Sequence, residues 1–201
     1  MTVHGRYTGI LRDDLANAFD VDSQDFPGVD FSDDLYRSNL RRSQCVSNVS
    51  ALTTQVMTSV ALYLREGDVV TNLTFVSATT AAGTPTNWWF ALYSPAATPA
   101  LLGQTADQTS TAWAANTAMT KALASPVTIA TTGIHYAAIM VKATTPPTLA
   151  GVALHNAVES GVIITGEKVL SQTSGSSLTD TAPATIATPT AIAGVPLVIA
   201  T

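Results

Sequence analysis

Short runs that mix hydrophobic and polar residues fill the chain from residue 46 onward. They are rich in Val, Ile, Thr and aromatic residues, have the length of β-strands, and are separated by Gly, Pro and Asn. This arrangement is typical of sandwiches and barrels, whereas Thr is too common for a helical bundle. The runs predict strands at residues 56–64, 69–78, 88–94, 101–107, 116–123, 133–143, 148–155, 161–166 and 195–200.

A low-complexity stretch at residues 171–194 separates the last two predicted strands. We expect it to cross the surface as a long connection, with Leu178 and Ile186 as its apolar anchors. The pattern as a whole predicts an all-β fold, a jelly-roll-like antiparallel β-sandwich over residues 46–201, with an extended, partly helical N-terminal arm over residues 1–45.

The N-terminal arm differs in composition, because charged residues there alternate with single bulky ones. The whole chain has 9 basic and 14 acidic side chains, and thirteen of these charged side chains lie in the arm. Short helices are expected at residues 12–19 and 32–43, separated by a break at Pro27 and Gly28. Because the arm has too few apolar residues to enclose a core, we expect it to dock on a partner or on its own domain. The expected docking residues are Phe19, Phe26, Phe31, Tyr36, Arg41 and Arg42.

Charge is scarce over the whole chain. Only 11% of the 201 residues are charged, and the net charge is -5. Because no basic patch suited to phosphate is visible, nucleic acid is not an expected partner. The uncharged stretches are interrupted before they reach membrane-spanning length, and the first residues lack the apolar segment of a secretory signal. We therefore expect neither membrane insertion nor export by a signal peptide.

Metal-binding patterns are weak in this sequence. The single Cys45 excludes an internal disulfide and cysteine clusters, and we expect it to be a half-buried thiol. The acidic run that begins at Asp20 has Asp25 and Phe31 where an EF-hand loop requires Gly and Glu. The histidines show no ligand spacing, and His135 is expected to be a structural or surface residue. No metal or other cofactor is expected.

Catalytic patterns are also missing from the sequence. It contains no G-x-S-x-G nucleophile turn and no phosphate-binding glycine loop. Among the few carboxylates of the β region, Glu66 and Asp68 lie close together, but around Gly67 they suggest a solvated hairpin turn. We do not expect an enzyme.

The adjacent Trp88 and Trp89 raise the question of a binding surface. Neighbours in a strand point to opposite faces, so Trp88 and Trp89 separate, and Tyr93 falls on the side of Trp89. We expect Trp88 in the core. The other side could be covered by a loop, stack on a sugar or press against a neighbouring subunit. Trp113, in a predicted loop, could be a lid over Trp89 or a separate contact. The candidate exposed aromatic contact is thus Trp89, Tyr93 and Trp113.

Several segments together carry a family resemblance. They are "GDVVTNLTF", "PTNWWFALY", "QTADQT" followed by "WAANT", "TTGIHYAAIMV" and the closing "AGVPLVIA". Residues 64–151, extended by the closing segment, resemble a β-sandwich domain found in virion proteins of tailed phages of actinobacteria. The N-terminal arm is not part of the resemblance, and the family supplies no catalytic residues.

The resemblance implies a phage virion structural protein, made in the host cytoplasm and displayed on the virion surface. The short chain favours a capsid decoration or head-surface protein that is anchored to the shell by its arm. Its expected partners are the major capsid protein or other virion proteins, and it is expected to form a homo-oligomer, with a trimer as the typical symmetric form. The alternative is a minor tail or receptor-binding protein that contacts cell-wall carbohydrate. A secreted carbohydrate-binding module or hydrolase is disfavoured, because the sequence has neither signal peptide nor carboxylate pair.

Overall fold

Antiparallel strands form the framework of the fold. The computed structural model describes residues 35–154 and 160–201, and the helical element whose bounds lie within those ranges is the 3-10 turn η2 (Arg42–Gln44). The strands are β1 (Arg37–Ser38), β2 (Ser47–Val49), β3 (Met57–Leu64), β4 (Val69–Val76), β5 (Asn87–Tyr93), β6 (Leu101–Gln104), β7 (Ala118–Thr128), β8 (Gly133–Lys142), β9 (Leu149–Ala153), β10 (Ser171–Ser174), β11 (Thr190–Ala191), β12 (Gly194–Pro196) and β13 (Val198–Ala200).

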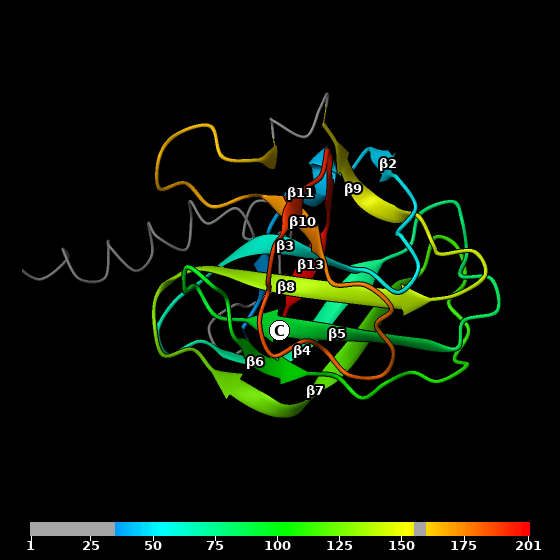
Figure 1. Ribbon diagram of the computed structural model, residues 1–201, viewed down its shortest axis with the longest axis horizontal. Coiled ribbons are helices and arrows are strands. Elements are labelled where there is room, and N and C mark those ends of the chain that lie inside the picture. The colour runs from blue at the N-terminus through cyan, green and yellow to red at the C-terminus, as the bar shows by residue number, and fades with distance from the viewer. Residues whose placement is uncertain (1–34, 155–159) are drawn as a thin grey trace, which may run out of the picture.

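The strands make three sheets. A six-stranded sheet has the order β11-β10-β3-β8-β5-β6, a four-stranded sheet has β1-β13-β4-β7, and a small sheet has β12-β9-β2. Successive strands pass between sheets, since β3, β5 and β8 belong to the first and β4 and β7 to the second (Figure 1). Every pairing is antiparallel. The predicted all-β, sandwich-like class is therefore confirmed.

The main core lies between the two large sheets. Phe75 of β4 meets Phe90 of β5 with ring centroids 4.9 Å apart. Trp88 is fully buried beside them, as strand parity predicts. The inward residues of β3, β5 and β8 are large and apolar, so burial of this layer supplies the hydrophobic stabilisation on which the sandwich depends.

The opposite face of the six-stranded sheet is covered as well. The connection from β10 to β11, residues 175–189, crosses in front of β8 and β5 (Figure 1). Its Leu178, Ala182 and Ile186 pack on a second apolar cluster that includes Trp89 and Met140. The predicted long connection is thus confirmed in its middle, while its two ends belong to β10 and β11. Cover on both faces explains why every residue of β5 after Asn87 is buried.

Two predicted strands differ from the structure. Residues 161–166 are not a strand but part of a turn, in which Gly166 has the left-handed φ of 89°. The predicted strand 195–200 is interrupted at Leu197, because β12 pairs with β9 whereas β13 pairs with β4 in another sheet. Apolar β-branched residues suit a strand, but the local pattern shows neither whether such a run finds a pairing partner nor where a chain changes sheet.

The helix predicted at 32–43 is wrong where the structure describes it. Residues 37 and 38 form β1, which pairs with β13 at the edge of the four-stranded sheet, and η2 is the only helical turn that follows. Leu35 and Leu40 pack against the main core. Tertiary contacts therefore override the local helix signals. The composition step at Cys45 does not mark the start of the folded domain, since residues 35–44 are already part of it. The helix predicted at 12–19 lies outside the described residues.

Asn39 fixes this N-terminal segment to the C-terminal strands. Its Nδ2 donates to the Pro196 carbonyl at 2.8 Å, and its Oδ1 accepts from the Val198 N–H at 2.9 Å. One carboxamide thus satisfies a backbone donor and a backbone acceptor where the chain passes from β12 to β13. An ion pair of 3.3 Å between Arg37 and Asp68 lies on the same segment.

Replacing Asn39 by Ala is expected to lower the free energy of unfolding by about 1–3 kcal/mol, because the Val198 N–H loses its partner in a partly buried place. Urea unfolding followed by tryptophan fluorescence would measure the change. Asn48→Ala is the matched control, since Asn48 is exposed and makes a single side-chain bond, to Thr79, and should change stability by about 0.5 kcal/mol or less. Equal effects of the two substitutions would contradict the role given to Asn39.

Candidate functional site

The expected aromatic contact surface is wrong, because Trp89 and Tyr93 are buried. Both side chains have 0% exposure beneath the β10–β11 connection. Trp89 Nε1 donates to the Thr179 carbonyl and the Tyr93 hydroxyl to the Pro183 carbonyl, each at 2.8 Å. Of the three alternatives for this face, cover by a loop is the one the structure adopts. The two polar ends hold the connection in place and are not available to a ligand.

Trp113 also fails to form an exposed contact. It is 1% exposed and lies on the other side of the sheet from Trp89, packed in the main core. Its ring centroid is 5.1 Å from that of Trp88, and its Nε1 donates to the Thr117 carbonyl at 3.0 Å. It is therefore neither a lid over Trp89 nor a surface group, but a residue of the main core.

The predicted docking residues fall in two groups. Phe19, Phe26 and Phe31 lie outside the described residues. Of the others, Tyr36 and Arg41 are partly buried next to β1 and η2, and Arg42 is exposed at the start of η2, which leaves a docking role for these three a prediction. Two smaller predictions are confirmed. Cys45 is half-buried and in no disulfide, and His135 is a structural residue with 1% exposure.

The turn between β3 and β4 contains Glu66 and Asp68, as expected, but it is not a hairpin. It joins strands of different sheets, with Gly67 at a φ of 91°. Asp68 accepts from the Arg65 N–H at 2.8 Å and pairs with Arg37, which gives this carboxylate a structural role. Among residues 35–154 and 160–201, no three His, Cys, Asp or Glu side chains are placed to share a metal ion. The described residues include no helix long and apolar enough to cross a membrane.

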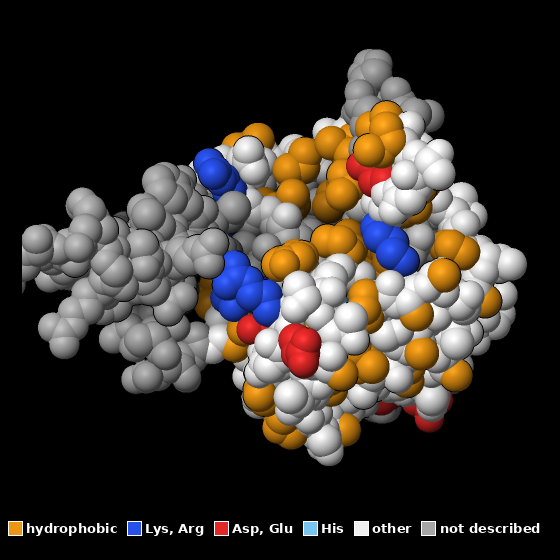
Figure 2. Space-filling view, turned by 90° about the vertical axis from the view of Figure 1, so that its left-hand side faces the viewer, with side chains coloured by type: hydrophobic (Ala, Val, Ile, Leu, Met, Phe, Trp, Pro, Cys, Tyr) orange, Lys and Arg blue, Asp and Glu red, His pale blue; other side chains and the backbone are white. Residues whose placement is uncertain are grey.

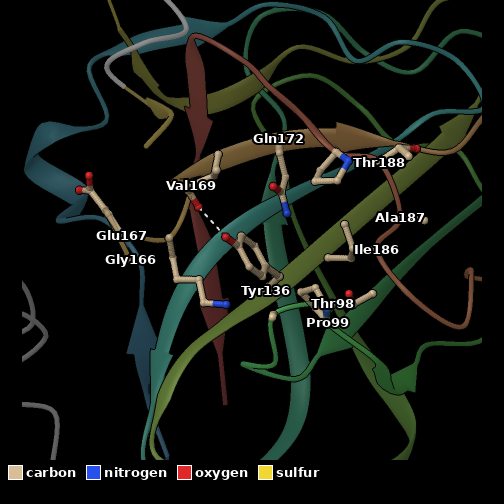
Figure 3. Close-up of a pocket in the computed structure, with 13 residues that line it drawn as sticks. Thr98, Pro99, Tyr136, Gly166, Glu167, Val169, Gln172, Ile186, Ala187 and Thr188 are labelled. Carbon is tan, nitrogen blue, oxygen red and sulfur yellow. Dashed lines mark hydrogen bonds between the residues drawn. The ribbon is translucent and has the colours of Figure 1, made fainter. Parts of the chain in front are cut away.

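A pocket of about 650 Å³ opens on the covered face of the six-stranded sheet. Four separate parts of the chain line it: the β5–β6 connection near Pro99, the Tyr136 side chain of β8, residues 166–172, and residues 186–189 (Figure 3). Its size lies within the range of roughly 300–1,000 Å³ that is usual for small-molecule sites. It is therefore a candidate for a binding site on the sandwich.

Gln172 is the polar side chain that the pocket leaves open to a ligand. The residue is only 3% exposed, and its carboxamide points into the pocket between Tyr136 and Ile186 (Figure 3). It makes no side-chain hydrogen bond to any other described residue. By contrast, the Tyr136 hydroxyl donates to the Val169 carbonyl at 2.9 Å, and burial raises the pKa of Tyr136 to about 12. Tyr136 is thus a neutral phenol at physiological pH, whose ring closes the floor.

Two charged residues stand at the pocket's rim, and both are engaged. Lys168 Nζ donates to the Ala96 carbonyl at 3.0 Å. One carboxylate oxygen of Glu167 accepts from the N–H groups of Ile163 and Ile164, at 2.9 and 3.2 Å. The Lys168 bond joins the segment before β10 to the β5–β6 connection, whereas the Glu167 bonds close a turn within that segment. The rim therefore presents one charge of each sign and no net charge.

The same loop carries an apolar tip. Val162, Ile163 and Ile164 are 53%, 67% and 68% exposed, and Glu167 holds them in the turn. Figure 2 shows hydrophobic side chains gathered over this loop at the top of the face. Exposed apolar groups of this kind occur at interaction surfaces. The sequence pattern placed these residues in a strand, so it did not reveal the exposure.

Comparisons with known proteins add no family to this geometry. No protein-family model matches the chain, and no curated protein matches it significantly.

Replacement of Trp89 or Trp113 by Ala is expected to lower the unfolding free energy by about 3–5 kcal/mol, because each leaves a cavity in a closed apolar cluster. Chemical denaturation would measure the loss. Tyr63→Ala serves as the control, since Tyr63 is 49% exposed and should change stability by about 0.5 kcal/mol. A stable, well-folded Trp89→Ala protein would contradict the structural role of this residue.

His135 should make stability depend on pH. Burial lowers its pKa, although its contact with the Gly133 carbonyl and the charge of Asp68 act in the opposite direction. The folded state keeps the ring neutral below the ordinary pKa of about 6.5, where the unfolded chain binds a proton, so stability is lost as pH falls through that range. The slope should reach at most about 1.4 kcal/mol per pH unit. Denaturation at pH 8 and pH 5.5 would show a larger loss in the wild type than in His135→Asn, and equal losses would argue against this effect.

Proposed function

We propose that this chain is a structural protein of a tailed-phage virion, displayed on the capsid surface and anchored to the shell by its N-terminal segment. The expected partner is the major capsid protein, and the protein would act as a homo-oligomer. The proposal combines the sequence resemblance with the sandwich-like fold, which suits a rigid surface ornament. In this proposal the sandwich faces outward and the N-terminal segment binds the shell.

The observation that carries the proposal is the attachment of the N-terminal segment to the sandwich. β1 pairs with β13, Asn39 bonds the β12–β13 crossing, and Arg37 pairs with Asp68. A load on the N-terminal segment would therefore be transferred through β1 to the edge of the four-stranded sheet. An anchor needs such a connection, because a segment joined only by a loose linker would leave the domain free to move relative to its partner.

The burial of Trp89, Tyr93 and Trp113 weighs against the alternative of a minor tail or receptor-binding protein that uses these aromatics to hold cell-wall sugars. Stacking needs an accessible ring face, and all three rings are enclosed. The aromatic residues predicted to dock on a partner are Phe19, Phe26 and Phe31, together with Tyr36. Phe side chains surrounded by charged residues suit a protein interface whose register is set by charge.

Removal of residues 1–34 should abolish binding to purified particles that lack the protein, while the sandwich remains folded. The cut is placed before Leu35, because Leu35, Leu40 and β1 are part of the fold and a longer deletion would damage it. Co-sedimentation would measure binding, and denaturation would verify folding. A full-length variant with Phe19, Phe26 and Phe31 changed to Ala should bind at least tenfold more weakly, whereas the same three changed to Leu should retain most binding. Undiminished binding of the deleted protein would overturn the proposal.

Copy number distinguishes a decoration protein from a tail component. Quantitative mass spectrometry of purified particles should find hundreds of copies per virion, since a decoration protein follows the symmetry of the shell. A few to a few tens of copies would favour the minor tail alternative, and absence from the particles would reject both.

A further inference from the structure

We propose that the pocket beside Gln172 binds a neutral saccharide unit. This site is separate from the N-terminal anchor and from the buried tryptophans, and it goes beyond the proposed virion role. It assigns a ligand class to a part of the sandwich that no sequence motif marks.

The first argument is the carboxamide of Gln172. The Gln172 side chain bonds to no other described residue, and its amide lies in the lining of the pocket. Its hydrogen-bonding groups are therefore open to a ligand that enters the pocket and displaces water. A carboxamide offers two donors and an acceptor in one plane. This combination matches adjacent hydroxyl groups, each of which can donate and accept.

The second argument is the balance of charge. Lys168 and Glu167 bring one charge of each sign, and each is bonded to backbone of the surrounding loops. The two charges cancel, so the rim as a whole favours neither a cation nor an anion. The remaining polar groups of the rim are the hydroxyls of Thr98 and Thr188. A ligand with several neutral hydroxyls fits these groups better than a phosphate, a carboxylate or an amine does.

The third argument is the apolar wall opposite the amide. Pro99, Ile186 and the ring of Tyr136 line that side (Figure 3). Such a wall suits the C–H face of a pyranose ring, while Gln172 faces its hydroxyl edge. This division of a pocket into an apolar surface and a few placed polar groups is the usual design of small-molecule sites.

The fourth argument is preorganisation. The Ile186 N–H donates to the Pro99 carbonyl at 2.9 Å, which joins two walls of the pocket. The bond from Tyr136 to Val169 joins β8 to the segment 166–172. The bond from Lys168 to Ala96 joins that segment to the β5–β6 connection. Segments that are fixed before binding lose less conformational entropy when a ligand arrives.

Titration of the full-length, isotope-labelled protein tests this inference by NMR. The probes are glucose, galactose, N-acetylglucosamine and their β-linked disaccharides. At least one should shift the side-chain amide signals of Gln172 and the methyl signals of Ile186 in a saturable way. Gln172→Met keeps the volume but removes the hydrogen bonds, so it should weaken the Ile186 response at least tenfold while leaving the thermal midpoint unchanged or higher. Gln44→Met, an exposed site outside the pocket, is the matched control and should bind normally.

Thr98→Tyr provides a second variant, because Thr98 is exposed at the rim and a larger side chain there should block the pocket without entering the core. It too should abolish the response. The inference is overturned if no saccharide of the panel gives saturable shifts, if both pocket variants bind within twofold of the wild type, or if a capped alanine dipeptide is bound in place of the sugars. The particle-binding experiment uses the N-terminal segment and would succeed or fail independently of these outcomes.

Discussion

The six-stranded sheet is stable only because both of its faces are covered. One face meets the four-stranded sheet, and the other meets a connection of residues 175–189 that has no regular structure along most of its length. Hydrogen bonds hold that connection along its length, among them those from Trp89 to the Thr179 carbonyl and from Tyr93 to the Pro183 carbonyl. Buried Trp and Tyr generally place their polar atoms against a partner, and here the partners are backbone carbonyls that a loop would otherwise leave to water. The last residues of the connection, 186–189, form one wall of the pocket.

The sequence allowed the fold class and most of the main strands to be predicted, because period-two patterns and turn residues are local properties. The same parity placed Trp88 in the core correctly. It could not determine the surroundings of Trp89, since an apolar face under a loop and an apolar face under a partner have the same pattern. The error at residues 32–43 is similar in kind: helix-end signals are local, but pairing with β13 depends on a segment about 160 residues further along the chain.

The candidate pocket was outside the reach of sequence analysis for a related reason. Its walls come from four segments separated by up to about 90 residues, and none of them carries a recognisable motif. Gln172 offered only a faint signal, as a long polar residue in a short strand otherwise made of Ser and Thr. Its significance arises from burial and from the lack of a side-chain partner, and both are properties of the assembled fold.

The position of β13 has a consequence for the order of folding. This strand, residues 198–200, lies between β1 and β4, and the Thr201 carbonyl accepts from the N–H groups of Thr71 and Asn72. During synthesis β4 can pair with β7 early, but β1 has no place in the sheet until the last of these residues has left the ribosome. Pairings of such long range close slowly, because a large loop entropy must be overcome first. Until then β4 presents an open edge, so the nascent sandwich passes through a stage at which strand exchange with another copy competes with correct closure.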